Sequence, residues 1–269
     1  METTNITLEN PYYAYLFGFI QTDGHLYKNT RDRGRLSIEI NKQDEHILWA
    51  FKNLIPFNSS ITERLRTTNF SSDTKTVIWR VYDKRFRDYL ELWGLPNGSK
   101  SQLIKLPSCQ FSKVDYFRGL IDGDGSLGLT SKGFPFLSLV TSSSNIAFGY
   151  LDLINQITGK VKTSTRNTRD SVYNIVVYKE DAQVLVRHLY YDNCLALSRK
   201  LIKASEVLNW SRPTDMRMVK NRKLWTPEED QFITTHSIEC SMKVLNRSQN
   251  SVEMRLWRLN KLSQQSVTN

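Results

Sequence analysis

Hydrophobic residues follow the same order of spacings twice along this chain. Apolar positions spaced as in a helix are followed by stretches in which every second residue is apolar. After an apolar helical segment that ends near Asp23, the first copy predicts these elements: a strand that begins near His25, a strand at 34–41, a helix at 42–55, strands at 59–68 and 75–82, and a helix at 84–95.

The second copy repeats this order after a helical segment that ends near Asp124. It predicts strands at 126–131 and 135–141, a helix at 143–157, strands at 159–166 and 171–178, and a helix at 180–191. Each copy is therefore a helix, two strands, a helix, two strands and a helix. This order predicts an α+β fold made of two αββαββα repeats.

The pattern changes beyond about Trp210. Residues 211–224 are rich in basic residues and have no apolar period, which predicts a linker. Residues 225–269 return to a compact helical pattern, in which Thr226 is a predicted N-cap and Glu229 completes a capping box. We therefore predict four parts: a first repeat at 1–106, a second repeat at 107–210, a basic linker at 211–224 and a helical module at 225–269.

The two apolar helical segments share a pattern of small residues. Gly18 and Thr22 are four residues apart in LFGFIQTDG, as are Gly119 and Gly123 in FRGLIDGDG. Small residues at this spacing lie on one helix face and let two helix backbones approach closely. Glycine costs up to about 1 kcal/mol inside a helix. Its use in both segments therefore predicts that the two helices cross tightly against each other.

Each segment also ends in an aspartate, although the C-terminal end of a helix disfavours negative charge. Crossing helices would bring Asp23 and Asp124 together, where their carboxylates repel. A divalent cation removes this repulsion, and Mg²⁺ is usually held by one or two carboxylates with phosphate oxygens and water. The pair predicts a site for Mg²⁺ or Mn²⁺ that binds phosphate. The alternative is that both aspartates are only turn residues between a helix and a strand.

The composition narrows the class of protein. A net charge of +10 favours a polyanionic partner, although a basic protein without one is the alternative. Cys109, Cys194 and Cys240 are far apart and form no CxxC or Cys/His cluster, so neither a zinc site nor a disulfide framework is expected. We expect a reducing compartment, such as the cytoplasm, the nucleoid or an organelle matrix.

Neither secretion nor membrane insertion is expected. The polar, acidic sequence METTNITLEN is unlike a signal or transit peptide. No apolar run approaches the length of about 18 residues that indicates a membrane helix.

The paired segments LFGFIQTDG and FRGLIDGDG resemble the two copies of the motif of the LAGLIDADG homing endonucleases. The resemblance covers about residues 10–208 and is to the single-chain form. It implies that Asp23 and Asp124 are the metal-binding, catalytic acids. The sixth motif position is Gln21 in the first copy and Asp122 in the second, a mild departure because that position is not the essential ligand.

The resemblance also implies two antiparallel four-stranded sheets that form a saddle on double-stranded DNA. Basic residues at alternate strand positions can reach base edges and phosphates. The candidate DNA contacts in the predicted strands are Arg64, Arg66, Arg80, Lys160, Lys162 and Arg166. The alternative for this set is a solvated outer face.

Two lysines occupy corresponding places after the last helix of each repeat, in PNGSKSQL and LALSRKLI. Lys100 and Lys200 therefore resemble the family's lysines beside the active site, with Arg199 a weaker neighbour. A lysine there would stabilise phosphoryl charge or position the attacking water. The alternative is that both lysines are ordinary exposed side chains.

The segments WTPEED and RSQNSVEMRLWRL resemble a Myb/SANT-like helix-turn-helix. The resemblance implies that the last helix enters the major groove, with Gln249, Asn250, Arg255 and Arg258 as candidate contacts. The linker residues expected at phosphates are Lys220, Arg222 and Lys223. The alternative is a helical cap packed on the core.

Taken together, these features predict a monomeric, site-specific, metal-dependent DNA endonuclease that makes a staggered double-strand break in a long target. One alternative is a regulator of the WhiA type, which joins a similar fold to a helix-turn-helix but lacks the catalytic acids that this chain retains. The other is a maturase that binds intron RNA, which the retained acids do not exclude.

Overall fold

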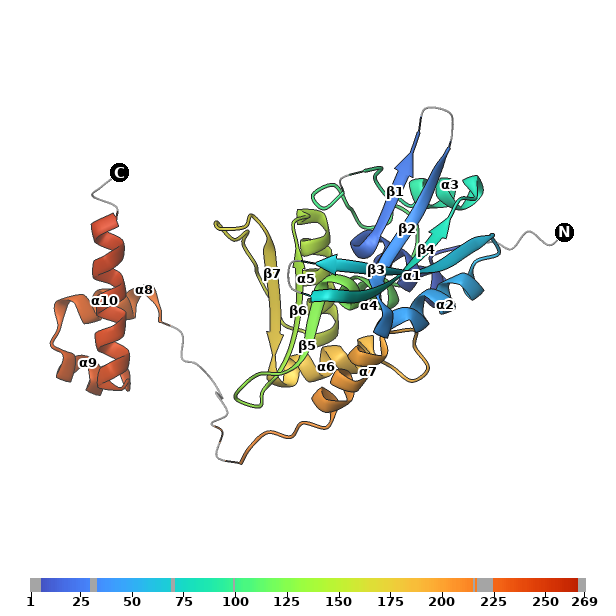
Figure 1. The fold of residues 1–269 in the computed structure, drawn as a ribbon. Helices are drawn as coiled ribbons and strands as arrows, with labels where there is room; N and C mark the ends of the chain where they lie inside the picture. The colour runs from blue at the N-terminus through green and yellow to red at the C-terminus, as the bar shows by residue number, and fades with distance from the viewer. Residues whose placement is uncertain are drawn as a thin grey trace. The chain divides into compact units, whose positions relative to one another are not determined.

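A computed structural model describes residues 6–29, 33–68, 71–98, 100–214, 216 and 225–265, with side chains except at 66–68, 71–74 and 260–265. The chain forms two compact units, Met1–Ser211 and Arg212–Asn269 (Figure 1).

The first repeat of the larger unit is a four-stranded antiparallel sheet with helices on one face. Its strands lie in the order β1-β2-β4-β3. The elements are α1 (Pro11–Asp23), β1 (Gly24–Lys28), β2 (Gly34–Asn41), the 3₁₀ helix η1 (Lys42–Asp44), α2 (Glu45–Leu54), β3 (Ser59–Thr68), β4 (Ser71–Val81) and α3 (Lys84–Leu92). Leu36, Ile38, Val77 and Trp79 alternate along β2 and β4 and are fully buried, so this face of the sheet packs on the core.

The second repeat has the same layout with a smaller sheet. Its strands lie in the antiparallel order β5-β6-β7. The elements are α4 (Lys113–Asp124), β5 (Gly125–Leu129), β6 (Pro135–Thr141), α5 (Ser144–Thr158), β7 (Tyr173–Tyr178), α6 (Lys179–Leu189) and α7 (Ser198–Leu208). The predicted α+β class with two antiparallel sheets is confirmed. Helix α7 was not predicted, because only a basic site was expected in that segment.

The strand predicted at 159–166 is wrong. Gly159 ends α5 in the left-handed conformation, with φ of 67°, and residues 160–167 form no strand. On the side of this segment opposite its basic residues, Val161 is the one apolar residue, and it is 84% exposed. A strand without an apolar face gains nothing by packing on the core. Within residues 113–214, all described, the second sheet therefore has three strands instead of the expected four.

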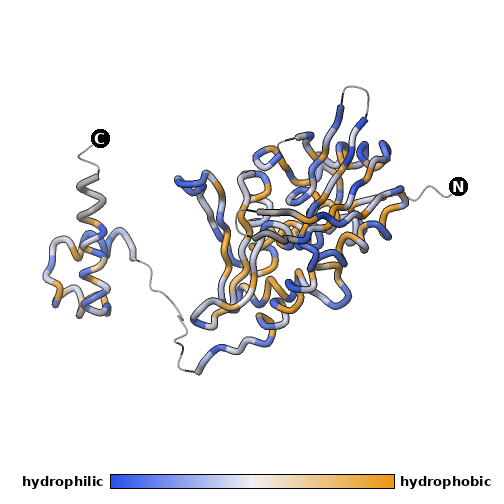
Figure 2. The backbone as a smooth tube through the Cα atoms, in the orientation of Figure 1, coloured by the Kyte–Doolittle hydropathy of each residue, from blue (hydrophilic) through white to orange (hydrophobic). Residues whose placement is uncertain are grey.

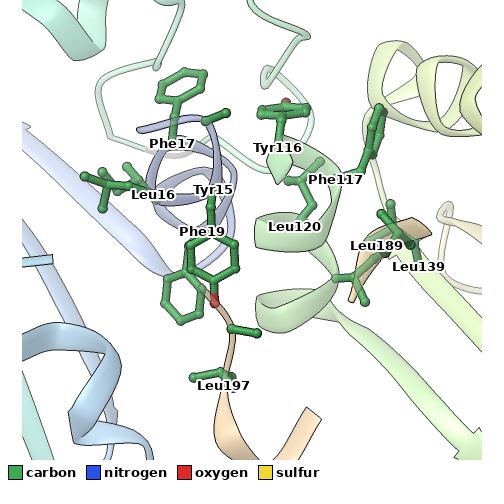
Figure 3. Packing of buried hydrophobic residues seen from close by; sticks show 14 of the residues in the cluster. Tyr15, Leu16, Phe17, Phe19, Tyr116, Phe117, Leu120, Leu139, Leu189 and Leu197 are labelled. Atoms are coloured by element: carbon green, nitrogen blue, oxygen red, sulfur yellow. The ribbon is translucent and has the colours of Figure 1, made fainter. Parts of the chain in front are cut away.

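The two repeats share one core, which is centred on α1 and α4. Tyr15, Phe17, Tyr116 and Phe117 on these helices are at most 1% exposed; Phe17 stacks on Tyr116 from one helix to the other, and Phe117 lies on the side of α4 away from α1 (Figure 3). The continuous hydrophobic cluster extends from Ile6 to Leu208, and hydrophobic residues predominate in the interior of the larger unit (Figure 2). The larger unit therefore has a complete core of its own.

The ends of α1 and α4 follow from local sequence. Asn10 caps α1 by accepting the N–H of Tyr12 at 2.9 Å, and Pro11 occupies the first turn. At α4, Ser112 makes no side-chain cap and its hydroxyl bonds the carboxylate of Asp115 instead. Asp115 is in turn the partner of the buried Arg118.

The smaller unit contains α8 (Pro227–Thr235), α9 (Ile238–Leu245) and α10 (Gln249–Gln265). The capping box between Thr226 and Glu229 is present as predicted. Ile233 and Val252 are buried between the helices, and the guanidinium of Arg247 lies 3.8 Å from the ring centre of Trp225.

Candidate functional site

Helices α1 and α4 are in direct backbone contact at their glycines. A Cβ atom on Gly18 would lie 2.1 Å from the carbonyl oxygen of Tyr116, and one on Gly119 would lie 2.2 Å from that of Tyr15. No real side-chain carbon tolerates such distances. The small residues singled out in the sequence therefore lie at the crossing, where they set the separation of the two helices.

The same crossing places the two motif aspartates together. A Cβ atom on Gly123 would lie 2.0 Å from the hydroxyl oxygen of Thr22 and 2.5 Å from Oδ2 of Asp23. The Asp23 carboxylate thus lies against the backbone of the residue that precedes Asp124. Two carboxylates from opposite repeats meet at the adjoining C-terminal ends of α1 and α4.

The electrostatics of the pair reflect this proximity. Both side chains reach solvent, but the surrounding protein removes enough water to raise the pKa of Asp23 and of Asp124. The negative charge of Asp23 raises the pKa of Asp124 further, while Lys100 and Lys200 oppose the rise. Burial and the neighbouring carboxylate therefore disfavour the charged form of Asp124, and a cation bound beside it would favour that form.

Lys100 and Lys200 occupy equivalent positions in the two repeats. The ammonium group of Lys100 donates to the carbonyl oxygens of Ile20 (2.6 Å) and Gly24. That of Lys200 donates to Ile121 (3.2 Å) and Gly125 (2.5 Å). Each lysine thus binds the final carbonyls of a motif helix, where a cation offsets the helix dipole.

Burial lowers the pKa of both lysines to about 8, and the nearby aspartates oppose this fall. Lys200 is only 5% exposed. The predicted position of both lysines near the acids agrees with the structure. Their binding to the helix carbonyls was not predicted, because a lysine that binds carbonyl groups has no characteristic spacing in the sequence.

Arg199 links the two repeats beside the first acid. Its guanidinium donates to the carboxylate of Asp44 at 3.0 Å, and it lowers the pKa of Asp23, whereas Asp44 raises it. Nearby, the N–H of Ser198 donates to Nε2 of His46 at 3.2 Å. Asp44 and His46 were missed in the sequence, where they belong to an ordinary amphipathic helix.

The strands carry two outward faces that begin next to the acids. His25 and Ser126, two residues after Asp23 and Asp124, are the first outward residues of β1 and β5. The strand register places these further described side chains on the outward face of the first sheet: Tyr27, Arg35, Ser37, Glu39, Thr62, Arg64, Thr76, Ile78 and Arg80. On the second sheet they are Phe136, Ser138, Val140, Asn174, Val176 and Tyr178.

Two of the predicted basic contacts lie on the first sheet, and the three assigned to the second sheet lie on no strand. Arg64 and Arg80 lie on the outward face of the first sheet, and Arg80 donates to the hydroxyl of Thr62 at 3.0 Å. The side chain of Arg66 lies outside the described residues. The three residues assigned to the absent strand, Lys160, Lys162 and Arg166, lie in the irregular segment before β7 instead.

Two of those three have internal partners. Lys160 pairs with Asp181 at 2.5 Å. Arg166 donates to the carbonyl of Ser142 at 2.9 Å and lies over the ring of Tyr173.

In the smaller unit, three of the candidate DNA contacts on α10 differ in their surroundings. Arg255 forms a two-pronged ion pair with Asp230, at 2.7 and 2.5 Å, which holds α10 to α8. It therefore contributes to the packing of the unit, and its predicted contact with bases stays a prediction. Asn250 and Arg258 are exposed on α10. The linker candidates Lys220, Arg222 and Lys223 lie outside the described residues.

In the described part of the chain, no three His, Cys, Asp or Glu side chains gather around a common point. None of the helices found in the same ranges is long and apolar enough to cross a membrane.

Comparisons with known proteins identify the fold. No protein-family model matches the sequence, and no curated protein matches it. Among solved structures, the homing endonuclease I-WcaI bound to its DNA recognition sequence is 15% identical, with a TM-score of 0.51 over 76% of this chain and 89% of that one.

Two other solved structures are similar at lower scores. The LAGLIDADG homing endonuclease I-GzeII in complex with its DNA target is 15% identical, with a TM-score of 0.47 over 73% of this chain and 87% of that one. The meganuclease I-SmaMI bound to uncleaveable DNA is 14% identical, with a TM-score of 0.47 over 74% of this chain and 87% of that one. The likeness to I-WcaI shows that this chain has the fold of a homing endonuclease.

Proposed function

We propose that this protein is a site-specific, metal-dependent DNA endonuclease that acts as a monomer and cuts both strands of a duplex. The observation that carries the proposal is the meeting of Asp23 and Asp124 at the ends of two crossing helices, one from each repeat. A single chain thereby supplies two acids to one centre. The likeness to I-WcaI, which is bound to its DNA recognition sequence, supports this function.

The two carboxylates fit a divalent metal. Mg²⁺ or Mn²⁺ needs only one or two carboxylates when phosphate oxygens and water complete its ligands. The mutual repulsion of Asp23 and Asp124 is what such an ion would relieve. When bound there, the metal would supply activation of water and stabilisation of the leaving oxygen.

The protein's own contribution is positioning. The glycine contacts hold the two acids at a fixed separation, and Lys100 and Lys200 fix the carbonyl ends of α1 and α4 that carry them. The lysines also place positive charge beside the position of the scissile phosphates. Charge that is already in place stabilises the developing phosphoryl anion without reorganisation.

The duplex would lie along the outward faces of the sheets. Arg35, Arg64 and Arg80 lie on the first of these faces, which begins beside Asp23. The exposed Asn250 and Arg258 of α10 would add contacts at one flank, as a helix-turn-helix does. The basic linker would join the two parts and raise their effective concentration on one DNA molecule.

The direct test is cleavage of a randomised duplex library in Mg²⁺, followed by sequencing of the cut ends. We expect one long preferred sequence with staggered ends. Asp23→Asn and Asp124→Asn should each abolish double-strand cutting while DNA binding is retained. Lys132→Met, an exposed lysine in the turn after β5, serves as the control. Cutting by both aspartate variants at the wild-type rate would refute the site.

A further inference from the structure

The outward faces of the two sheets differ in chemistry. On the first face, Arg35, Glu39, Arg64 and Arg80 are charged. On the second face, where residues 125–129, 135–141 and 173–178 are all described, no outward residue carries a charge. The repeats therefore match in fold but not in the surface that they present.

The second face is largely apolar and accessible. Phe136 lies opposite Tyr178 across β6 and β7, and Ser138 lies opposite Val176. Val140 is 38% exposed and Tyr178 is 53% exposed. Ordinary solvated strand faces carry polar side chains at such positions, so this face is suited to contact with an apolar ligand surface.

This face is continuous with the proposed active site. Ser126 begins its outward residues directly after Asp124 and Gly125. Val140 lines a cavity of about 350 Å³ together with Asp124, Thr22 and Ser142. A duplex whose phosphate lies at Asp124 would therefore continue over Val140 and its neighbours.

Positive charge lies at the border of the face. Arg166 is tied to Ser142, beside the cavity, and lies over the ring of Tyr173 at the start of β7. Lys162 belongs to the same segment. Arg166 and Lys162 at this border can hold backbone phosphates while the apolar centre of the face contacts the bases. In DNA complexes, phosphate contacts position the protein and base contacts read the sequence.

We propose that the second sheet recognises its half-site through van der Waals contact with thymine methyl groups, mainly from Phe136, Val140 and Val176. The thymine C5-methyl is the apolar group that the base edges present in the major groove. The first sheet, with its arginines and glutamate, recognises the other half-site by hydrogen bonds and charge. The inference rests on the proposed function and adds that the two half-sites are recognised by different kinds of contact.

The test replaces thymine by uracil, which removes only the methyl group, in one half of the selected target at a time. Binding is measured by titration with the full-length Asp23→Asn protein. Each buried methyl is worth about fourfold in affinity. We expect a loss of about fourfold per contacted thymine in one half-site and little change in the other.

Isosteric variants show whether this face is responsible. Val140→Thr with Val176→Thr keeps the shape and strand preference of both residues and exchanges one methyl of each for a hydroxyl, so it should reduce the penalty for uracil, while Phe136 keeps its own contact. The matched control is Thr62→Val on the first sheet, which should leave that penalty unchanged. Thermal melting verifies that the variants are folded.

Three results would overturn the inference: equal sensitivity of both halves, no sensitivity, or a penalty that the double variant leaves as large as in the unchanged sheet. A dimer that Phe136→Arg dissociates in sedimentation would instead assign the face to a second copy of the chain. Failure of the wild-type protein to cut any duplex in Mg²⁺ rejects the proposed function itself, and is therefore distinct from these results.

Discussion

The hydroxyl of Tyr15 donates a 2.6 Å hydrogen bond to the carboxylate of Asp122, from the first motif helix to the second. The equivalent bond runs the other way, from Tyr116 to the amide oxygen of Gln21. Tyr15 and Tyr116 occupy the same place in the two motifs, as do Gln21 and Asp122. The departure noted at the sixth motif position is thus part of a crossed pair of buried hydrogen bonds.

Asp122 also accepts from the hydroxyl of Tyr190 (2.7 Å) and the N–H of Leu197 (2.7 Å). Burial raises its pKa, which these donors oppose. Asp122→Leu leaves these donors without an acceptor, at about 1–3 kcal/mol each, and should lower stability by at least about 2 kcal/mol. Asp122→Asn should change it by less than about 1 kcal/mol, because Gln21 shows that an amide fits. Urea unfolding at pH 7 measures both, and equal losses would contradict this account.

The backbone contact at Gly119 gives a second prediction. Gly119→Ala places a carbon against the Tyr15 carbonyl and should destabilise the protein by about 1–3 kcal/mol, as overpacking does. Gly149→Ala in α5 is the matched control, because its Cβ meets only the flexible end of the Leu106 side chain. Thermal melts compare the two, and an unchanged melting temperature for Gly119→Ala would contradict the tight crossing.

The buried lysines predict a pH dependence. Their folded pKa of about 8 lies below the ordinary value of 10.5, so between pH 8 and 10.5 the unfolded chain binds more protons than the folded protein. The lysines' contribution to the free energy of unfolding therefore rises with pH across this window. Denaturation at pH 7.5–9.5, without metal or DNA, should show a steeper rise for wild type than for Lys100→Met with Lys200→Met. The exposed Lys132→Met variant should show the same pH dependence as wild type. If the free energy of unfolding changes with pH equally in all three proteins, Lys100 and Lys200 do not have lowered pKa values in the folded state.

The helical module should extend the DNA contact at one end. The truncated protein that ends at Ser211 keeps the complete core of the larger unit and should still cut, but with a footprint shortened at one end. In the full chain, Arg258→Ala should weaken binding without lowering the melting temperature of the module, whereas Arg255→Ala should lower that temperature because it breaks the pair with Asp230. An identical footprint for both chain lengths would mean that the module does not contact DNA.

The sequence predicts what depends on local spacing. Two glycine faces and two terminal acids sufficed to foresee the crossing of α1 and α4, since backbone contact requires small residues at fixed intervals. The strand at 59–68 was predicted correctly because Ile61 packs inward and β4 supplies a partner. The strand at 159–166 failed because alternation of basic residues alone provides no surface to bury.

Contacts between distant segments left no local pattern. The tyrosine repeat at Tyr15 and Tyr116 could have been noticed, but its partners are 107 and 95 residues away. The pairing of Arg255 with Asp230 likewise depends on how α10 packs on α8, and a basic residue on a predicted recognition helix looks the same whether it faces outward or inward.

The backbone contact between α1 and α4 at Gly18 and Gly119 has a consequence for how such a protein changes over generations. The distance between the two acids is fixed by main-chain atoms, so exchange of side chains on the sheets leaves it untouched. Under the proposed function, mutations at Arg80 or Val176 would alter which sequence is bound, while the spacing of the two cuts would stay constant. A lineage with this architecture would then drift from one target to another and keep the same overhang.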